Sequence, residues 1–184
     1  AIGSNAGKQL TTGCGNIFLG DEVGACNTTG NHNFIAMTNA GLTGTCSCDN
    51  VIIGINAGYA NNGNANIFLG RCAGRDNSTG GYNLYLGCKT GQEATTGNYN
   101  VFLGHEAVSG GIVTGNDNIS VGRKSGCCLT SGCQNIFLGL SAGKKITTAG
   151  DNIMIGRSVA AESTATACSN IVMGLEAGYN MGSA

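Results

Sequence analysis

The chain has 184 residues and a formal net charge of −1, with 10% charged residues, 33 glycines and no proline or tryptophan. It therefore lacks the basic field that binds nucleic acid, and no apolar run approaches the length of a membrane span. Neither nucleic acid nor a membrane is an expected partner.

One motif fills the whole chain. An asparagine, called the ladder Asn below, recurs every 16 to 18 residues, at Asn16, Asn33, Asn50, Asn66, Asn83, Asn100, Asn118, Asn135, Asn152 and Asn170. A repeat this short is less than one unit of a helical array, whose periods begin at roughly 20 to 34 residues. The sequence therefore predicts an all-β fold, a single-domain parallel β-solenoid of about ten coils that spans residues 1–184.

Each predicted strand is the three-residue apolar run after a ladder Asn. In chain order the strands are expected at 17–19, 34–36, 51–53, 67–69, 84–86, 101–103, 119–121, 136–138, 153–155 and 171–173. Alternate side chains of a strand point the same way, so we expect the first and third residues of each run to fill the coil interior.

The residues between the strands predict corners. Gly follows nine of the ten runs, and a second Gly comes four residues later in most coils, as expected where the backbone needs positive φ. A small residue between these corners predicts a second inward site, at Ala40, Ala57, Ala73, Ala107, Ala142 and Ala177.

The ladder Asn is expected to hydrogen-bond the equivalent Asn one coil above and one coil below, as in other stacked β structures. The alternative is a turn residue that tolerates a left-handed backbone.

The second residue of each strand would then point outward. It is apolar in nine coils, and these residues form a predicted outer stripe: Phe18, Ile35, Ile52, Phe68, Tyr85, Phe102, Phe137, Met154 and Val172. A contiguous apolar surface of several hundred Å² indicates a partner. A loop of the same chain could cover the stripe, but coils this short leave little spare chain, so we expect identical rods to pack by it, most simply three around an axis.

The repeat also resembles a known family. The string at 135–151, NIFLGLSAGKKITTAGD, is similar to the short repeats of trimeric phage tail fibres and bacterial surface fibres that carry a C-terminal intramolecular chaperone, and more distantly to the heads of trimeric autotransporter adhesins. The resemblance implies a homotrimeric fibre or adhesin segment, extracellular, at the cell surface or on a virion, with a cell-surface receptor or glycan as a further partner. It also implies no catalytic chemistry.

Both ends of the chain interrupt a repeat and offer no polar cap. Solenoids normally need caps, so the pattern predicts either a fragment of a longer fibre or head-to-tail stacking into a filament.

Ten cysteines favour an oxidising location and disulfide bonds. The expected pairs are Cys72 with Cys88, Cys128 with Cys133, and Cys26 with Cys46 or Cys48, with bonds between subunits and buried reduced thiols as alternatives. Zinc is a poor fit, since no Cys-x-x-Cys pair occurs, and no metal or cofactor is expected.

No Ser, His and Asp set recurs in one register, and the Gly-Lys pairs that suggest a phosphate loop are corners of the repeat, so no catalytic residue is expected. Asn27 and Asn77 lie in Asn-x-Thr sequons and could bear glycan.

The alternative function is ice binding, because several antifreeze proteins are small β-solenoids rich in Cys and Thr. Ice faces need regularly spaced Thr on a flat strand, whereas here adjacent Thr residues precede a turn Gly.

Overall fold

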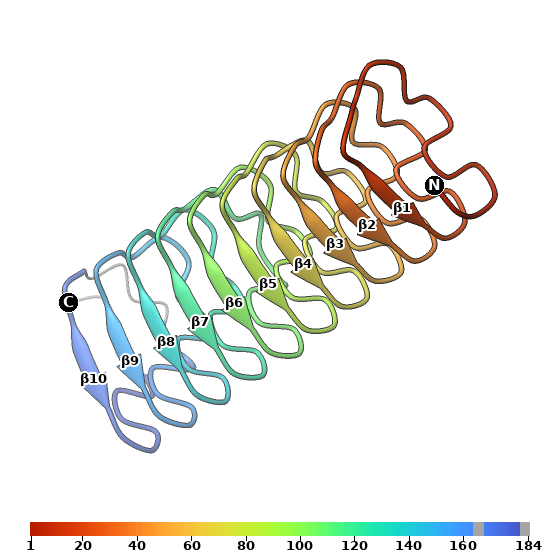
Figure 1. Cartoon of the computed structure of the whole chain (residues 1–184). Helices are drawn as coiled ribbons and strands as arrows, with labels where there is room; N and C mark the ends of the chain where they lie inside the picture. The colour runs from red at the N-terminus through yellow and green to blue at the C-terminus, as the bar shows by residue number, and fades with distance from the viewer. Residues whose placement is uncertain (164–167, 181–184) are drawn as a thin grey trace.

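The computed structural model describes residues 1–163 and 168–180, which form one rod-shaped β-solenoid (Figure 1). Its ten parallel strands form a single sheet in chain order, which confirms the predicted fold and all ten predicted strand positions. The strands are β1 (Ile17–Leu19), β2 (Phe34–Ala36), β3 (Val51–Ile53), β4 (Ile67–Leu69), β5 (Leu84–Leu86), β6 (Val101–Leu103), β7 (Ile119–Val121), β8 (Ile136–Leu138), β9 (Ile153–Ile155) and β10 (Ile171–Met173).

Equivalent residues of neighbouring coils lie level with one another. In β5 and β6, for example, Leu84 pairs with Val101 and Leu86 with Leu103. The turns that complete each coil are tied in the same way, because their backbone N–H groups bond to carbonyl oxygens of a neighbouring coil, as Gly24 N does to Ala40 O at 3.0 Å. Cohesion between coils therefore runs around the whole rod and is not confined to the sheet.

The predicted orientation of the strand residues is wrong. The second residue of each strand points into the coil: Phe68, Tyr85 and Phe102 are 0% exposed. The first and third residues point outward and are half-buried or exposed. The ladder Asn precedes the strand and is itself buried, so alternation places the residue two positions later on the same inner side.

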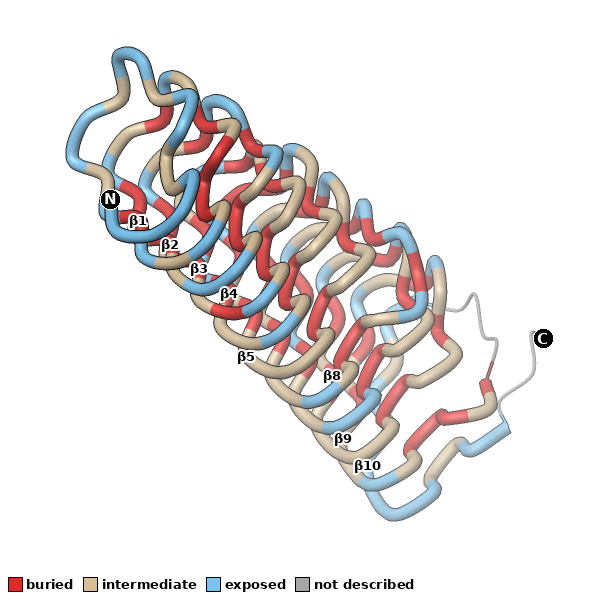
Figure 2. Tube along the Cα trace, turned by 90° about the vertical axis from the view of Figure 1, so that its right-hand side faces the viewer, coloured by how far each residue is buried: buried red, intermediate tan, exposed pale blue. Residues whose placement is uncertain are grey.

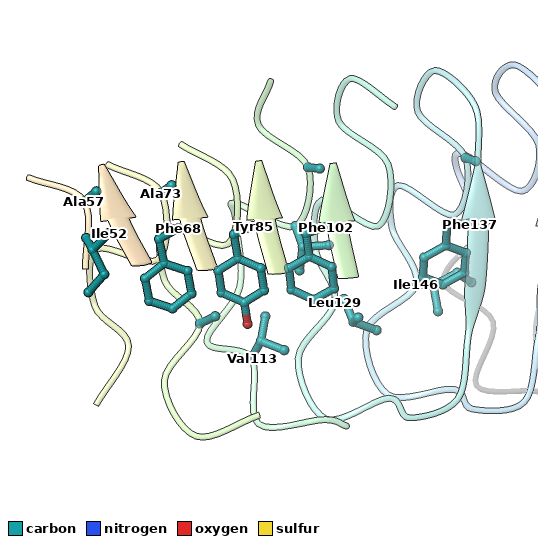
Figure 3. Packing of buried hydrophobic residues seen from close by; sticks show 14 of the residues in the cluster. Ile52, Ala57, Phe68, Ala73, Tyr85, Phe102, Val113, Leu129, Phe137 and Ile146 are labelled. Atoms are coloured by element: carbon teal, nitrogen blue, oxygen red, sulfur yellow. The ribbon is translucent and has the colours of Figure 1, made fainter. Parts of the chain in front are cut away.

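The second strand residues form the spine of the core. The rings of Phe68, Tyr85 and Phe102 stack with centroids 4.9 and 4.8 Å apart, which is about the spacing of adjacent strands (Figure 3). A buried band follows the length of the rod in Figure 2. The predicted second inward site is confirmed at Ala40, Ala57, Ala73, Ala107 and Ala142, all 0% exposed, and Ala177 is partly buried against the same core.

The Asn ladder is confirmed. In all nine steps the side-chain Oδ1 of one ladder Asn accepts the backbone N–H of the next. In seven steps it also accepts a hydrogen bond from the next side-chain Nδ2, for example from Asn135 to Asn118 at 3.0 Å. The same Nδ2 of Asn135 donates to the carbonyl of Ala149, in the turn that closes its own coil, at 2.9 Å. Each ladder Asn therefore fixes three parts of the coil stack at once.

The glycine corners are confirmed by their backbone angles. Gly139, directly after β8, has φ of 132°, and Gly143 has φ of 57°. A Cβ on Gly143 would lie 2.6 Å from the Phe137 ring, so this corner also requires the absence of a side chain. Met37 replaces the first corner Gly in one coil and takes φ of 82°, a conformation that is costly for a side chain of this size.

Candidate functional site: the outer face of the sheet

The first and third strand residues form an unbroken apolar surface, called the outer face below. Its twenty members are all apolar: Ile17, Leu19, Phe34, Ala36, Val51, Ile53, Ile67, Leu69, Leu84, Leu86, Val101, Leu103, Ile119, Val121, Ile136, Leu138, Ile153, Ile155, Ile171 and Met173. Ile67 and Ile119 in the middle of the rod are 40% and 39% exposed. Neighbours one strand away shield their flanks, but their outward ends meet solvent.

The size of the outer face is set by strand geometry. Nine spacings of about 4.8 Å and three residues of about 3.3 Å give roughly 43 Å by 10 Å before the relief of the side chains is counted. That area lies within the range of the largest apolar patches on ordinary monomers, which are often functional. In Figure 1 the sheet forms one outer side of the rod, and no described segment crosses in front of it.

The residues predicted as the oligomer interface do not lie on this surface. Eight of the nine residues of the predicted outer stripe are buried, and the ninth, Val172, is partly buried against the core: Phe18, Ile35, Ile52, Phe68, Tyr85, Phe102, Phe137, Met154 and Val172. Buried side chains cannot contact a partner, so this assignment is corrected. Sequence reasoning gave the first and third positions to the interior, although the same alternation and a buried ladder Asn point to the opposite orientation.

All ten cysteines are free thiols in the structure, so none of the predicted disulfide pairs is formed. Cys72 and Cys88 are out of register by one residue, because the backbone bond from Lys89 N to Arg71 O sets Cys88 beside Arg71 and Lys89 beside Cys72. Cys26, Cys46 and Cys48 are likewise unbonded, as are Cys128 and Cys133.

Some thiols have a structural role that sequence reasoning missed. The Sγ atoms of Cys48 and Cys133 accept backbone N–H bonds from Asn31 and Asn116, each at 3.3 Å. Asn side chains do the same in other coils, as Asn64 Oδ1 does for Cys48 N at 2.8 Å. A second ladder of mixed Cys and Asn thus runs beside the Asn ladder, two residues before it.

A column of Thr and Ser hydroxyls forms a third ladder. Thr28 Oγ1 donates to Thr45 O at 3.0 Å, and Thr130 Oγ1 donates to Thr147 O at 3.0 Å. These hydroxyls bond between coils and are not left free to order water. The observation removes the Thr column as a reason to prefer ice binding.

Both predicted glycosylation sites are buried. Asn27 is 1% exposed and its Oδ1 accepts the backbone N–H of Gly30, while Asn77 is 0% exposed and donates to the carbonyl of Gly80. Glycan attachment requires an accessible side-chain nitrogen, so these two sequons are structural turn residues in the folded rod.

No group of three or more His, Cys, Asp or Glu side chains within residues 1–163 and 168–180 is arranged to hold a metal ion. No pocket opens on the surface of this part of the chain. Its secondary structure also contains no helix that could cross a membrane.

Comparison with known proteins identifies no relative: no family model, no curated protein and no solved structure matches the chain.

Proposed function

We propose that the chain is a non-enzymatic structural subunit of an extracellular or virion fibre, and that identical copies associate through the outer face. The single observation that supports the proposal most strongly is the composition of that face. Twenty outward side chains on ten strands are apolar without exception, although nothing in the described chain covers them. Solvent-exposed strands ordinarily alternate apolar and polar residues, because only one side packs on a core.

Three copies around an axis use this face most simply. The first strand residues of one copy would pack against the third strand residues of the next, a head-to-tail contact that closes after three steps. Each interface would then join two rows of aliphatic side chains that repeat at the same spacing. Because the rows have equal repeats, they can interdigitate along the full length of the rod.

Stacking of rods end to end is a second mode of self-association. β10 pairs only with β9 among the described strands, so its other edge presents backbone groups to which a further strand can add. A receptor or glycan would bind a different surface, since the outer face is occupied in the assembly.

The test is the mass of the purified chain in sedimentation velocity and light scattering. We expect a discrete multiple of the 18.4 kDa protomer, most simply three. The double variant Leu84→Asp with Leu86→Asp places two carboxylates in the middle of the outer face and should dissociate the assembly. Ile112→Asp is the matched control, because Ile112 is 62% exposed in a loop away from the sheet.

Circular dichroism must show that the Leu84→Asp, Leu86→Asp variant keeps its β structure. A wild-type chain that stays monomeric at tens of micromolar would refute the proposal, as would a face variant that assembles as well as the control. Thermal hysteresis of the wild-type chain would support the ice-binding alternative instead.

A further inference from the structure

The two edges of the outer face differ in charge. The residues two positions before each strand form one edge, with Asp49, Asp117 and Asp151 and no Lys or Arg in any coil. The residues two positions after each strand form the other edge, with Arg71, Arg123 and Arg157 and one acidic residue, Asp21. We call these the Asp edge and the Arg edge. The face is therefore electrically asymmetric across its width.

Two coils place the opposite charges at the same level. β7 begins two residues after Asp117 and ends two residues before Arg123. β9 lies in the same way between Asp151 and Arg157. All four side chains are exposed, and within residues 1–163 and 168–180 none of them makes an ion pair.

These four charges cannot pair with each other within one rod. Asp117 and Arg123 are separated by the whole width of the strand, six residues and roughly 20 Å of extended chain. Other charges of similar exposure do find partners, as Lys124 does with Glu106 at 3.5 Å. The unpaired set thus coincides with the borders of the outer face.

We propose that Asp117 and Asp151 of one copy pair with Arg123 and Arg157 of the next, and that these pairs hold the copies parallel and level. The inference rests on the proposed function, since it requires copies to meet at the outer face. In a parallel assembly about the rod axis, the Asp edge of each copy adjoins the Arg edge of its neighbour. In an antiparallel assembly each edge would adjoin its own kind, and like charges would face one another.

Two tyrosines on the Asp edge agree with this orientation. Tyr82 and Tyr99 are 60% and 57% exposed, and their rings stack at 5.1 Å. In a parallel, level assembly these rings would lie beside Cys88, Lys89 and His105 of the next copy. The contact would remove aromatic surface from water and set the ring faces near cationic side chains.

Charge reversal tests the pairing on the assembled protein. Asp117→Arg with Asp151→Arg makes both edges basic at these two levels, and Arg123→Asp with Arg157→Asp makes both edges acidic. Each double variant should weaken assembly about tenfold or more in Kd at low ionic strength, because two attractive contacts per interface become repulsive. The fourfold variant that exchanges all four charges should restore wild-type assembly.

The matched control is Asp49→Arg, on the same edge but level with Ile55, where there is no Arg to repel. It should leave the Kd of assembly unchanged, and high salt should reduce the differences among all the variants. If both double variants assemble like the wild type, or if the fourfold exchange fails to restore assembly, the pairing is overturned while the outer face remains the interface. A monomeric wild type would instead refute the proposed function itself.

Discussion

Replacement of Tyr85 by Phe should stabilise the protein. The Tyr85 ring is 0% exposed between Phe68 and Phe102, and its hydroxyl has no hydrogen-bond partner. Asn100 is the nearest candidate donor, but its Nδ2 bonds to Asn83 Oδ1 at 3.3 Å and to Gly115 O at 3.0 Å. Burial raises the pKa of Tyr85 well above its ordinary value, with a smaller opposing effect of Asn100, so the hydroxyl stays neutral at physiological pH.

The magnitude follows from the cost of a buried polar group without a partner, about 1 to 3 kcal/mol. Phe occupies the equivalent position in four other coils, so the ring of Tyr85→Phe fits without repacking. We expect a gain of about 1 to 2 kcal/mol, which for a chain of this size raises Tm by about 2 to 8 °C. The reverse change, Phe102→Tyr, adds a second hydroxyl to the same stack and should lower stability by a similar amount.

Thermal unfolding followed by circular dichroism measures the effect, at equal protomer concentration because association shifts apparent stability. Tyr82→Phe is the control, since the Tyr82 hydroxyl is on an exposed side chain and its loss should change Tm little. A Tm for Tyr85→Phe at or below that of the wild type would show that the hydroxyl is bonded in the folded rod, and the reasoning would fail.

Four further changes test the ladders, corners and thiols. Asn118→Ala removes five hydrogen bonds at a site that is 0% exposed and should cost about 3 kcal/mol in urea unfolding, far more than Asn39→Ala outside the ladder. Gly143→Ala should cost about 1 to 3 kcal/mol in the same assay, because its Cβ meets the Phe137 ring. Ser120 Oγ and Ser125 Oγ are 2.7 Å apart and both residues are buried, so Ser120→Ala or Ser125→Ala alone should destabilise, by about 1 kcal/mol, while the double change costs less than the sum of the two. Burial, with a smaller contribution from Cys127, raises the pKa of the Cys128 thiol, so timed alkylation read by mass spectrometry should label Cys128 more slowly than exposed Cys14.

The parts of the fold that depend on repetition could be predicted from sequence. A polar residue that recurs once per coil stacks on copies of itself, and the predicted Asn ladder is present in every step. Glycines at fixed offsets need positive φ, and Gly139 and Gly143 have it. These predictions needed only the spacing and the chemistry of one residue type.

The facing of the strands could not be read from the apolar pattern. All three residues of a strand such as Ile136–Leu138 are apolar, so alternation fixes two sets without saying which is inside. The signal that decides the matter is size. The interior holds a single bulky side chain per strand, and aromatic rings occur mainly at the second position, as at Phe137. The buried ladder Asn gives the same answer once its side chain is placed.

The cysteine pairing could not be predicted either, because a disulfide requires equivalent level and facing. Cys72 and Cys88 differ by one position in the repeat, which is enough to set them beside Lys89 and Arg71 instead of each other. Repeat position, rather than separation along the chain, decides which side chains meet in a solenoid.

Repetition within the chain distinguishes what the fold needs from what an assembly needs. Corner glycines, inner rings and ladder side chains recur because each must match its copy one coil away. Outward positions elsewhere on the rod vary freely, and Asp21, Ile55 and Arg123 share one of them. The outer face recurs like the core, with twenty apolar residues, although its outward ends contact nothing in the described chain. A constraint that the chain's own packing does not supply must come from another molecule, and a second copy offers the same repeat at the same spacing.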